Sequence, residues 1–597
     1  MSNEVKPTGR SLADRIVKAT VAIAAAHAMA KAFGLVQARV IGHYYGFGDT
    51  GDAFFLVFDG LIMMLFMVGE ESLLPASLPC FVEAKEKDSE EAAWRFVSTL
   101  LNLQVLLLLC AVALLMLFPQ QAIELFSRFK ASEDGGASRM ELAAYFLKGM
   151  APALVGLSVG SLTYMVLNGY KIFFWAAFAD AALKAALVGG ILFGRQFGLS
   201  DDALVVGVLA AGVTKIVVHL LALSPKLRLW RPHIALSDPN FRRFLLLVIP
   251  LIAGILFAKA RDFFNQFYVI SELGTGLVST HTFGRKIFSA IHFLIPYPLS
   301  IALFPFFCEM VDRGDRASLG DALTRSSRML LLMFLPLTVV LCVISIPMAQ
   351  ALFQTGKVTE ADAVRSGLVN MCYLAALPFQ SLECVFMQAY FSTRRMWSVT
   401  LIGILFSSLS IMVSYIGVLV YGLRGMDAVM LVALGWSGSR ALKLIALIGL
   451  LKWQGMPVLQ IGPTAGFLLR AAMVMLICGG SAYGVRIGVE RFMSSEPAMI
   501  EKAPAETDLG KKAVAPPKDM EEKEDQTNKS KKPRVSGKEA LIRAMPRLAL
   551  PSIVAFILFF PACKLLRLKE LDEILAFAKE KLRRKKGGKP PAEEASS

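Results

Sequence analysis

Three carboxylates recur along one long apolar run of the sequence. Asp52, Asp59 and Glu70 lie at and within the run 53–82, seven and eleven residues apart. On an α-helix each residue turns the chain by about 100°, so both spacings return to within about 20° of one direction and predict a shared stripe. Such a stripe indicates interhelical ion pairs or a wet interior surface. Asp52, at the start of the run, is alternatively interpreted as an exposed helix cap.

Positive charges interrupt the neighbouring apolar runs. They are Lys31 in the run 17–45, Lys259 and Arg261 in 242–271, and Arg285 in 277–309. An ionisable group in hydrocarbon costs about 2.5 to 3.5 kcal/mol, so these side chains must face a partner or a wet cavity. A cavity lined by them would attract phosphate, to which arginine offers bidentate contact. The alternative is that they form structural ion pairs with the carboxylates or extend toward the membrane surface.

Other ionisable residues in apolar runs have simpler predicted roles. Asp180 and Lys184 are four residues apart, so they are expected to satisfy each other within one helix. Arg440 and Lys443 are expected to extend toward the membrane surface. No partner is predicted for Glu383.

Long apolar windows must position all of these charges. Hydrophobic residues make up 55% of the 597 and charged ones 18%, and the mean hydropathy is +0.56, which sets the chain apart from ordinary soluble domains. A window of about 20 apolar residues is long enough to cross a bilayer as a helix. The sequence therefore predicts an all-α polytopic membrane protein with about fourteen helices, near residues 17–45, 53–82, 94–118, 142–167, 172–193, 203–224, 242–271, 277–309, 327–353, 364–392, 397–420, 427–451, 464–488 and 547–567.

The helix count and the largest basic loop predict two six-helix lobes and an appended pair of helices. Such a pair of bundles commonly encloses a binding site between its halves. The linker before the last helix is rich in Lys, Glu, Pro and Ser, which is typical of disorder. The predicted parts are the N-terminus 1–16, the N-lobe 17–225, the basic inter-lobe loop 226–241, the C-lobe 242–452, the thirteenth helix 464–488, the charged linker 489–546, the last helix 547–567 and the basic tail 568–597.

Basic residues gather in the loops on one side of the predicted bundle. By the positive-inside rule, both termini of this multi-pass protein are then expected to face the cytoplasm. The net charge of +16 has no soluble basic domain to carry it. Anionic membrane lipids are therefore the predicted partners of these charges, and nucleic acid is not.

The sequence lacks the motifs of several chemistries. It has neither a phosphate-binding loop of the ATPase type nor a nucleophile motif. The eight cysteines have no metal-ligand spacing and are predicted to be free thiols in the membrane. We therefore expect a secondary transporter that is not an enzyme and holds no metal or cofactor, and whose first helix is not a cleaved signal.

Several short motifs resemble the MurJ/MviN lipid II flippase family, within the multidrug/oligosaccharidyl-lipid/polysaccharide flippase superfamily. These are Gly51-Asp52-Ala53-Phe54-Phe55 followed by Glu70 and Pro79, Arg242-Arg243-Phe244, Leu303-Phe304-Pro305 and Ala389-Tyr390-Phe391. The resemblance implies translocation of undecaprenyl-pyrophosphate-linked peptidoglycan precursor from the inner to the outer leaflet of the bacterial inner membrane. It also implies alternating access of two lobes around a cationic cavity, a lipid-tail groove at the last two helices, and cell-wall synthesis proteins as partners.

The resemblance assigns roles to some charged residues. At other positions where the family has a functional residue, this sequence has a different one. Lys31 stands at a cavity arginine of the family, Arg285 at the arginine of its eighth-helix motif, and Asp52 at its second-helix acid. The departures are Gln37, Ala38, His43, Leu65, Phe66 and Gly284 at charged family positions, and Asn265 at a sodium-linked aspartate. We therefore expect the anion clamp to have moved toward Lys259, Arg261 and Arg285.

The resulting hypothesis is a cycle of ion pairs. Lys31, Arg261 and Arg285 would hold the pyrophosphate, and Asp52 and Glu70 would pair with these cations when the site is empty. The alternatives are a flippase for another polyprenyl-linked glycan, such as an O-antigen or exopolysaccharide unit, a multidrug antiporter, or a membrane scaffold.

Overall fold

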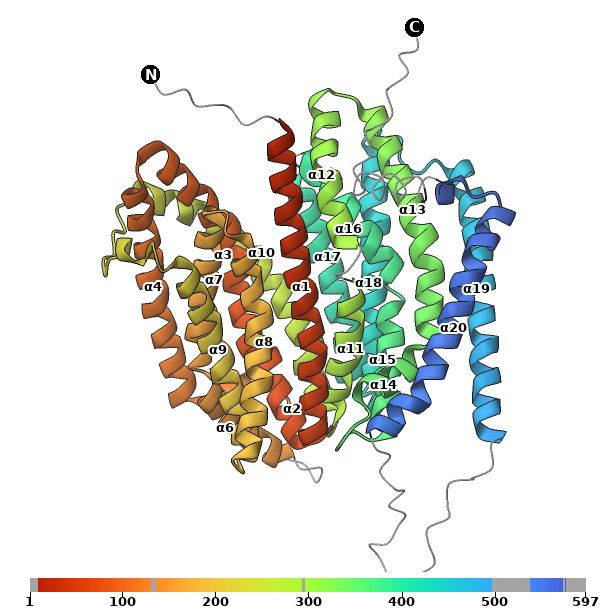
Figure 1. The fold of residues 1–597 in the computed structure, drawn as a ribbon, viewed down its shortest axis with the longest axis horizontal. Coiled ribbons are helices and arrows are strands. Elements are labelled where there is room, and N and C mark those ends of the chain that lie inside the picture. Colours follow the sequence, from red (N-terminus) through yellow and green to blue (C-terminus); the bar gives the residue numbers. More distant parts are fainter. Residues whose placement is uncertain are drawn as a thin grey trace, which may run out of the picture.

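The computed structural model describes residues 9–129, 136–292, 296–393, 395–495, 537–572 and 575, and every regular element in them is helical. Residues 1–8, 496–536 and 576–597, which hold parts of the predicted N-terminus, linker and tail, lie outside the described residues. Figure 1 shows long helices running roughly parallel to one another. The predicted all-α class is confirmed.

Helices α1 to α9 form one packing group, which we call the first group. Helix α1 packs on α8, α8 on α9, α9 on α7, and α7 on α3. Its elements are α1 (Gly9–Tyr45), α2 (Asp49–Phe55), η1 (Leu56–Ile62), α3 (Met63–Glu83), η2 (Ala84–Asp88), α4 (Glu90–Leu117), α5 (Pro119–Phe126), α6 (Gly136–Met150), α7 (Ala153–Gly169), α8 (Phe173–Gln196) and α9 (Asp202–Leu223).

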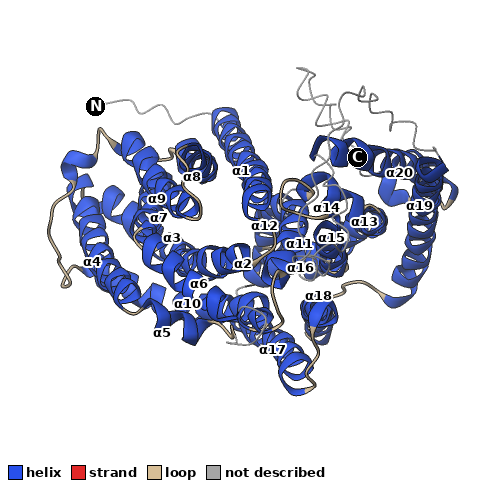
Figure 2. Cartoon of the chain, turned by 90° about the horizontal axis from the view of Figure 1, so that it is seen from below, coloured by secondary structure: helices blue, strands red, loops and turns tan. Residues whose placement is uncertain are grey.

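Helices α11 to α18 form the second group, and α19 and α20 pack as a pair against its α13 and α14. Helix α10 contacts α3 of the first group and α17 of the second. The elements are η3 (Leu227–Leu229), α10 (Pro239–Phe263), η4 (Phe264–Tyr268), η5 (Ile270–Glu272), α11 (Leu277–His292), α12 (Pro296–Asp312), α13 (Arg316–Val343), α14 (Ser345–Phe353), α15 (Glu360–Leu374), α16 (Leu377–Ser392), α17 (Met396–Ser414), η6 (Tyr415–Val420), α18 (Gly425–Trp453), α19 (Ile461–Ser495) and α20 (Gly537–Leu565). Figure 2 shows the first group on one side, the second beside it, and α19 and α20 at the far edge.

Nine helices in the described ranges are long and apolar enough to cross a membrane, or twelve if each of three bent pairs is one span. The exact count of about fourteen stays a prediction. One bend of 51° lies between α6 and α7, and one of 42° between α15 and α16. Pro152 precedes α7 and Pro378 lies in the first turn of α16. Proline lacks the N–H that would continue the previous helix, so both bends have a local cause.

Several predicted boundaries differ from the structure. The expected helix 327–353 divides at Ile344 into α13 and α14. Helix α1 begins at Gly9, inside the predicted N-terminal segment, because an apolar window marks only the part of a helix suited to hydrocarbon. The predicted linker 489–546 is helical at both ends, where α19 continues to Ser495 and α20 begins at Gly537. The extension of α20 buries Ala540 and Ala544, and a linker assignment from charge alone overlooks that contact.

Glycines allow α7 and α9 to approach closely, which gives a first test of the fold. A Cβ on Gly156 would collide with the carbonyl oxygen of Gly212, and one on Gly212 would lie 2.8 Å from the carbonyl oxygen of Ala153. Gly156→Val should therefore destabilise the protein by about 1–3 kcal/mol through overpacking, seen as a lower apparent Tm in detergent. Gly189→Val on α8 is the matched control because no heavy atom lies within 4 Å of its Cβ. Equal Tm values for the two variants would contradict this packing.

Candidate functional site

Asp52 joins the two groups at the end of the bundle where α2 and α11 begin. Its carboxylate accepts hydrogen bonds from Gly276 N at 2.6 Å, Ser279 N at 2.8 Å and Ser279 Oγ at 2.6 Å, and the residue is fully buried. The first N–H groups of a helix lack partners within the helix, and its positive end favours a carboxylate. Asp52 therefore caps α11 from another helix. It neither caps its own helix at an exposed start nor pairs with Lys31, Arg261 or Arg285, so both expectations for this residue were wrong.

Several further contacts close the same end of the bundle. Arg39 Nη1 donates to the carbonyl oxygens of Ala351 and Leu352, each at 2.8 Å. Lys357 N donates to the carbonyl oxygen of His43 at 3.0 Å, and the His43 ring lies 2.9 Å from Thr355 Oγ1. These bonds tie α1 to the last turn of α14 and to the loop that follows it. We call this the sealed end, and the end with the loops 84–89, 224–238 and 312–316 the basic end (Figure 1).

Asp59 of the predicted stripe pairs with a lysine of α11, and Glu71, the neighbour of Glu70, pairs with a lysine of α10. Lys286 Nζ of α11 lies 2.9 Å from Asp59, and Lys259 Nζ of α10 lies 2.6 Å from Glu71. Asp59 sits in the π-helical segment η1, whose wider turns change the direction of every side chain that follows. The spacing of 100° per residue therefore fails between Asp59 and Glu70.

Glu70 points into the first group instead. Lys215 Nζ lies 3.0 Å from Glu70 and 3.0 Å from Asp180, and its side chain is fully buried over the Phe66 ring. Glu70 therefore does not pair with the predicted cavity cations. Asp180 does not pair with Lys184 within its helix either, because Lys184 Nζ donates to the carbonyl oxygen of Ala30 at 2.9 Å. Tertiary packing has brought a deeper lysine to both carboxylates.

Two arginines in the second group share one aspartate. Arg261 donates from Nε and Nη2 to Asp262 Oδ1 at 2.9 and 2.7 Å, and from Nη1 to Ser407 Oγ at 2.7 Å. Arg285 Nη2 lies 3.7 Å from Asp262 Oδ2. Of the predicted cations, the structure thus brings Arg261 and Arg285 together. Lys259 is two residues from Arg261 but binds α3, as described above.

A second carboxylate in this group also serves two cations. Arg440 Nη1 and Lys443 Nζ lie 3.1 and 2.6 Å from Glu383. Both cations bind inside the protein, so the expectation that they extend toward the membrane surface was wrong. The sequence signal was present, since Glu383 had no predicted partner and a buried carboxylate needs one.

Aromatic rings lie between the cluster around Asp262 and the cluster around Glu383. The Arg285 guanidinium lies 5.9 Å from the Tyr373 ring and that of Arg440 lies 5.0 Å from the Trp436 ring. The two rings are themselves 5.2 Å apart, and Tyr373 Oη lies 2.8 Å from His281 Nε2. Cations are stabilised over aromatic faces. The rings therefore fix Arg285 and Arg440 relative to each other.

Charge is unevenly divided between the groups. In the first group two carboxylates share Lys215, whereas in the second Asp262 and Glu383 each serve two cations. Local positive charge thus exceeds negative charge around α10, α11, α16 and α18. Lys31 of α1 is half-buried and lies within electrostatic range of Asp180 and Lys184 of α8, as well as of His292 of α11.

Many of these charged side chains keep accessible surface although they lie far along apolar helices. The side chains of Asp59, Glu70, Asp180, Asp262, Arg285 and Lys286 keep between 21% and 28% of their surface accessible. Their accessible atoms and excess positive charge make this a region that can receive a polar anionic group.

The cap from Asp52 to α11 can be tested by hydrogen exchange. Asp52→Ala should leave three buried donors without their acceptor, at a cost of about 1–3 kcal/mol. Exchange at the first turns of α11 should then accelerate by about tenfold, measured by mass spectrometry on the full chain. Asp49→Ala on the same helix is the control, because Asp49 is 38% exposed and its contacts with Arg139 and Thr275 are 3.5 and 3.3 Å long. Unchanged protection in the Asp52 variant would rule out the cap.

The buried Lys215 should be required for stability only while Glu70 and Asp180 carry negative charge. Lys215→Met leaves Glu70 and Asp180 unpaired and should lower stability by about 3–5 kcal/mol. Adding Glu70→Gln and Asp180→Asn removes both uncompensated charges and should restore most of the apparent Tm. If the triple variant were no more stable than Lys215→Met, the charge balance of this cluster would not explain its stability.

Comparison with known proteins identifies the family. A sequence model described as Lipid II flippase MurJ matches residues 41–499. A probable lipid II flippase MurJ of Borreliella burgdorferi is 24% identical over 424 residues, which are 69% of this chain and 80% of that protein. A lipid II flippase MurJ of Burkholderia cenocepacia is 24% identical over 335 residues, 55% of this chain and 64% of that protein.

Solved structures share the fold at low identity. A lipid II flippase MurJ in an inward closed conformation superposes with a TM-score of 0.63 at 19% identity, covering 77% of this chain and 92% of that one. An inward-facing multidrug resistance MATE family transporter of the MOP superfamily gives 0.59 at 13% identity, covering 71% and 94%. The family match over most of the sequence agrees with the helical, multi-pass architecture, and the chain belongs to the lipid II flippase MurJ family of bacterial membrane proteins.

Proposed function

We propose that this protein moves lipid II, an undecaprenyl-pyrophosphate-linked peptidoglycan precursor, from the inner to the outer leaflet of the bacterial inner membrane. The observation that carries the proposal is the set of guanidinium groups of Arg261, Arg285 and Arg440, deep in the bundle and joined by aromatic rings. They share Asp262 and Glu383 with Lys443, which leaves positive charge uncompensated. A pyrophosphate supplies the missing negative charge.

Arg285 is the cation best placed to change partner. Its contact with Asp262 is 3.7 Å long, whereas Arg261 holds the same carboxylate through two bonds of 2.7 and 2.9 Å. Arginine matches phosphate oxygens with bidentate geometry, so an arriving pyrophosphate can compete for Arg285 first. Lys31, in range of α11, and Lys259 flank this centre from α1 and α10.

Alternating access is supported by the position of the contacts between the two groups, which close one end of the bundle. The sealed end is fastened by Asp52 and by the bonds of Arg39 and His43, all between elements that precede residue 56 and elements that follow residue 270. The loops of the basic end would face the cytoplasm, as would both termini, and the substrate would then enter from the inner leaflet. Helices α1 and α20 both have their terminal ends at this side (Figure 1). Reclosure around the substrate would then open the sealed end.

The proposal keeps two lobes whose boundary in the sequence is at residues 226–241. It assigns the carboxylates Asp52, Asp59 and Glu70 to structural contacts instead of to pairs with the substrate-binding cations. Helix α10 contacts both groups and would be the element along which they move. Asp59, through Lys286, and Asp52, through α11, would hold the sealed state. Glu70 would keep the first group rigid through Lys215. A multidrug antiporter is not favoured, because a cationic centre repels the cations that such proteins export.

Removal of the three guanidinium groups should abolish the clamp. Arg261→Gln, Arg285→Gln and Arg440→Gln together should weaken lipid II binding by at least about tenfold, since one hydrogen bond to a charged group contributes about 1.5–3 kcal/mol. Native mass spectrometry of the purified protein measures binding. The same variant should fail to support growth of a strain depleted of its lipid II flippase, whereas the wild type should support it.

Two companion variants show whether a loss of binding comes from the three arginines of the clamp. The alternatives are a general loss of positive charge and misfolding. Arg313→Gln, Arg316→Gln and Arg325→Gln remove three exposed arginines at or near the basic end and should leave binding unchanged. Asp262→Asn frees Arg261 and Arg285 and should keep or strengthen binding. Normal complementation by the clamp variant at normal protein levels would contradict the proposed site, and failure of the well-expressed wild type would contradict the proposed substrate.

A further inference from the structure

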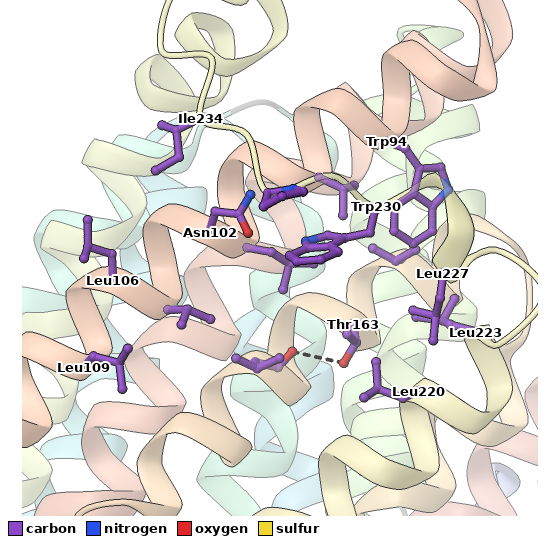
Figure 3. Close-up of a pocket in the computed structure, with 16 residues that line it drawn as sticks. Trp94, Asn102, Leu106, Leu109, Thr163, Leu220, Leu223, Leu227, Trp230 and Ile234 are labelled. Carbon is purple, nitrogen blue, oxygen red and sulfur yellow. Dashed lines mark hydrogen bonds between the residues drawn. The ribbon is translucent and has the colours of Figure 1, made fainter.

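A cavity lies apart from the charged region, in the half of the first group that is nearer the basic end. It has a volume of about 650 Å³, within the range of about 300–1,000 Å³ typical of ligand pockets. Its walls are α4, α7, α9 and the loop that follows α9 (Figure 3). The lining is almost entirely apolar and includes Trp94, Asn102, Leu106, Leu109, Trp230 and Ile234.

The loop over this cavity is fastened to α4 by hydrogen bonds. Ser98 Oγ accepts from Arg231 N at 3.1 Å and Thr99 Oγ1 accepts from Ala235 N at 3.2 Å. Asn102 Nδ2 donates to the carbonyl oxygens of Arg231 and His233, both at 2.9 Å. Three polar side chains of one helix thus hold residues 230–235 as a strap, so the cavity is built into the fold.

The inner wall is equally well held. Trp94 is 2% exposed, and its Nε1 donates to Tyr170 Oη at 2.8 Å. Tyr170 in turn donates to Glu90 at 2.5 Å, and Glu90 lies 2.7 Å from Lys226 Nζ. This chain of contacts connects α4 to the residues that directly follow α7 and α9. The ring of Trp94 is therefore a fixed wall.

The cavity faces lipid. Leu106 and Leu109 line it, yet 52% and 53% of their surface is exposed, and Trp230 and Ile234 of the strap are 41% and 42% exposed. Figure 2 places α4 at the outer edge of the first group, with α7 and α9 between it and the second group. The cavity therefore opens toward the surrounding membrane and not toward the arginine centre.

The length of the cavity fits a hydrocarbon chain. Its α4 wall runs from Trp94 to Leu109, and fifteen steps along a helix span about 22 Å. One leaflet of the hydrocarbon core is about 15 Å thick, half of the bilayer core. A single acyl chain can thus lie along the wall with its polar end beside the strap.

Basic residues surround that polar end. Lys226, Arg228, Arg231 and His233 lie in the loop, against one acid, Asp238. Lys226 pairs with Glu90, whereas Arg228 and Arg231 are exposed and no carboxylate within the described ranges pairs with either. The mouth of an apolar cavity with unpaired arginines matches an anionic headgroup joined to an acyl chain.

We propose that this cavity binds one acyl chain of an anionic membrane phospholipid, with the phosphate held at Arg228 and Arg231 of the strap. The bound lipid fills the space between α4, α7 and α9 and fixes the first group in its leaflet. The lipid is a resident of the protein, separate from the transported substrate.

Quenching of tryptophan fluorescence by bromine tests the proposal. Full-length protein carrying Trp175→Phe, Trp397→Phe and Trp453→Phe keeps Trp94 and Trp230 in the cavity and loses three exposed tryptophans. It is titrated in detergent with phosphatidylglycerol or phosphatidylcholine brominated in the acyl chains. We expect saturable quenching at one lipid per protein, with phosphatidylglycerol preferred by about tenfold because two arginines near a membrane surface each favour anionic lipid.

Matched variants separate the chain site from the headgroup site. Val159→Phe and Leu220→Phe narrow the cavity and should reduce quenching by at least about half, whereas Val217→Phe on the exposed face of α9 should not. Arg228→Gln with Arg231→Gln should remove the preference for phosphatidylglycerol, whereas Arg313→Gln with Arg316→Gln should keep it. An unchanged apparent Tm shows that a variant is folded.

Three outcomes would overturn the proposal. The first is equal, unsaturable quenching by both lipids, which indicates contact with bulk lipid only. The second is unchanged quenching in a folded Val159→Phe and Leu220→Phe variant. The third is displacement of the brominated lipid by undecaprenyl phosphate about tenfold more readily than by unbrominated phosphatidylglycerol, which would assign the cavity to the substrate's class of lipid.

Discussion

The cost of holding charge away from water governs how these helices pack. Each carboxylate far along an apolar helix lies against a lysine or arginine of another helix or, for Asp262, against both its neighbour Arg261 and Arg285 of α11. An unpaired charge would cost several kcal/mol, so these contacts select which helices become neighbours. Asp52 obeys the same constraint by accepting three hydrogen bonds at a helix start. Apolar side chains fill the remaining space, but the ionic partners specify the arrangement.

The two groups use this constraint differently. Lys215 sits between two carboxylates and has no exposed surface, so it ties α3, α8 and α9 into one unit. In the second group each carboxylate is shared by two cations, and Arg285 keeps 26% of its surface accessible. The first arrangement satisfies charge internally, and the second leaves it available to a ligand. A rigid first group beside a second group that can bind an anion is a suitable basis for alternating access.

The sequence predicted the apolar helices well because a membrane span depends on local composition. Windows of about 20 apolar residues located most of the long helices between α1 and α20, and family motifs led to the correct family. They did not locate the short α5, and they joined pairs such as α13 and α14 into one predicted helix. Partners were predicted poorly, because they depend on which helices meet. Asp180 has Lys184 four residues away, yet it binds Lys215. The π-helical turn at Asp59 also removes the regular spacing on which the stripe of Asp52, Asp59 and Glu70 was based. Arg440 could have been placed beside Glu383 had every buried carboxylate been required to have a cation.

The Asp52 contact at the sealed end and the Glu71–Lys259 contact along α10 differ in their response to dissolved salt. Asp52 is sealed from solvent and bound by short hydrogen bonds, so mobile ions cannot screen it. Glu71, which fastens α3 to α10 through Lys259, has 43% of its side chain exposed, and such a pair weakens as ionic strength rises. Salt therefore loosens the contact along α10 while leaving the Asp52 contact intact. Of these two contacts, the one made by the buried Asp52 is therefore the less sensitive to ionic strength.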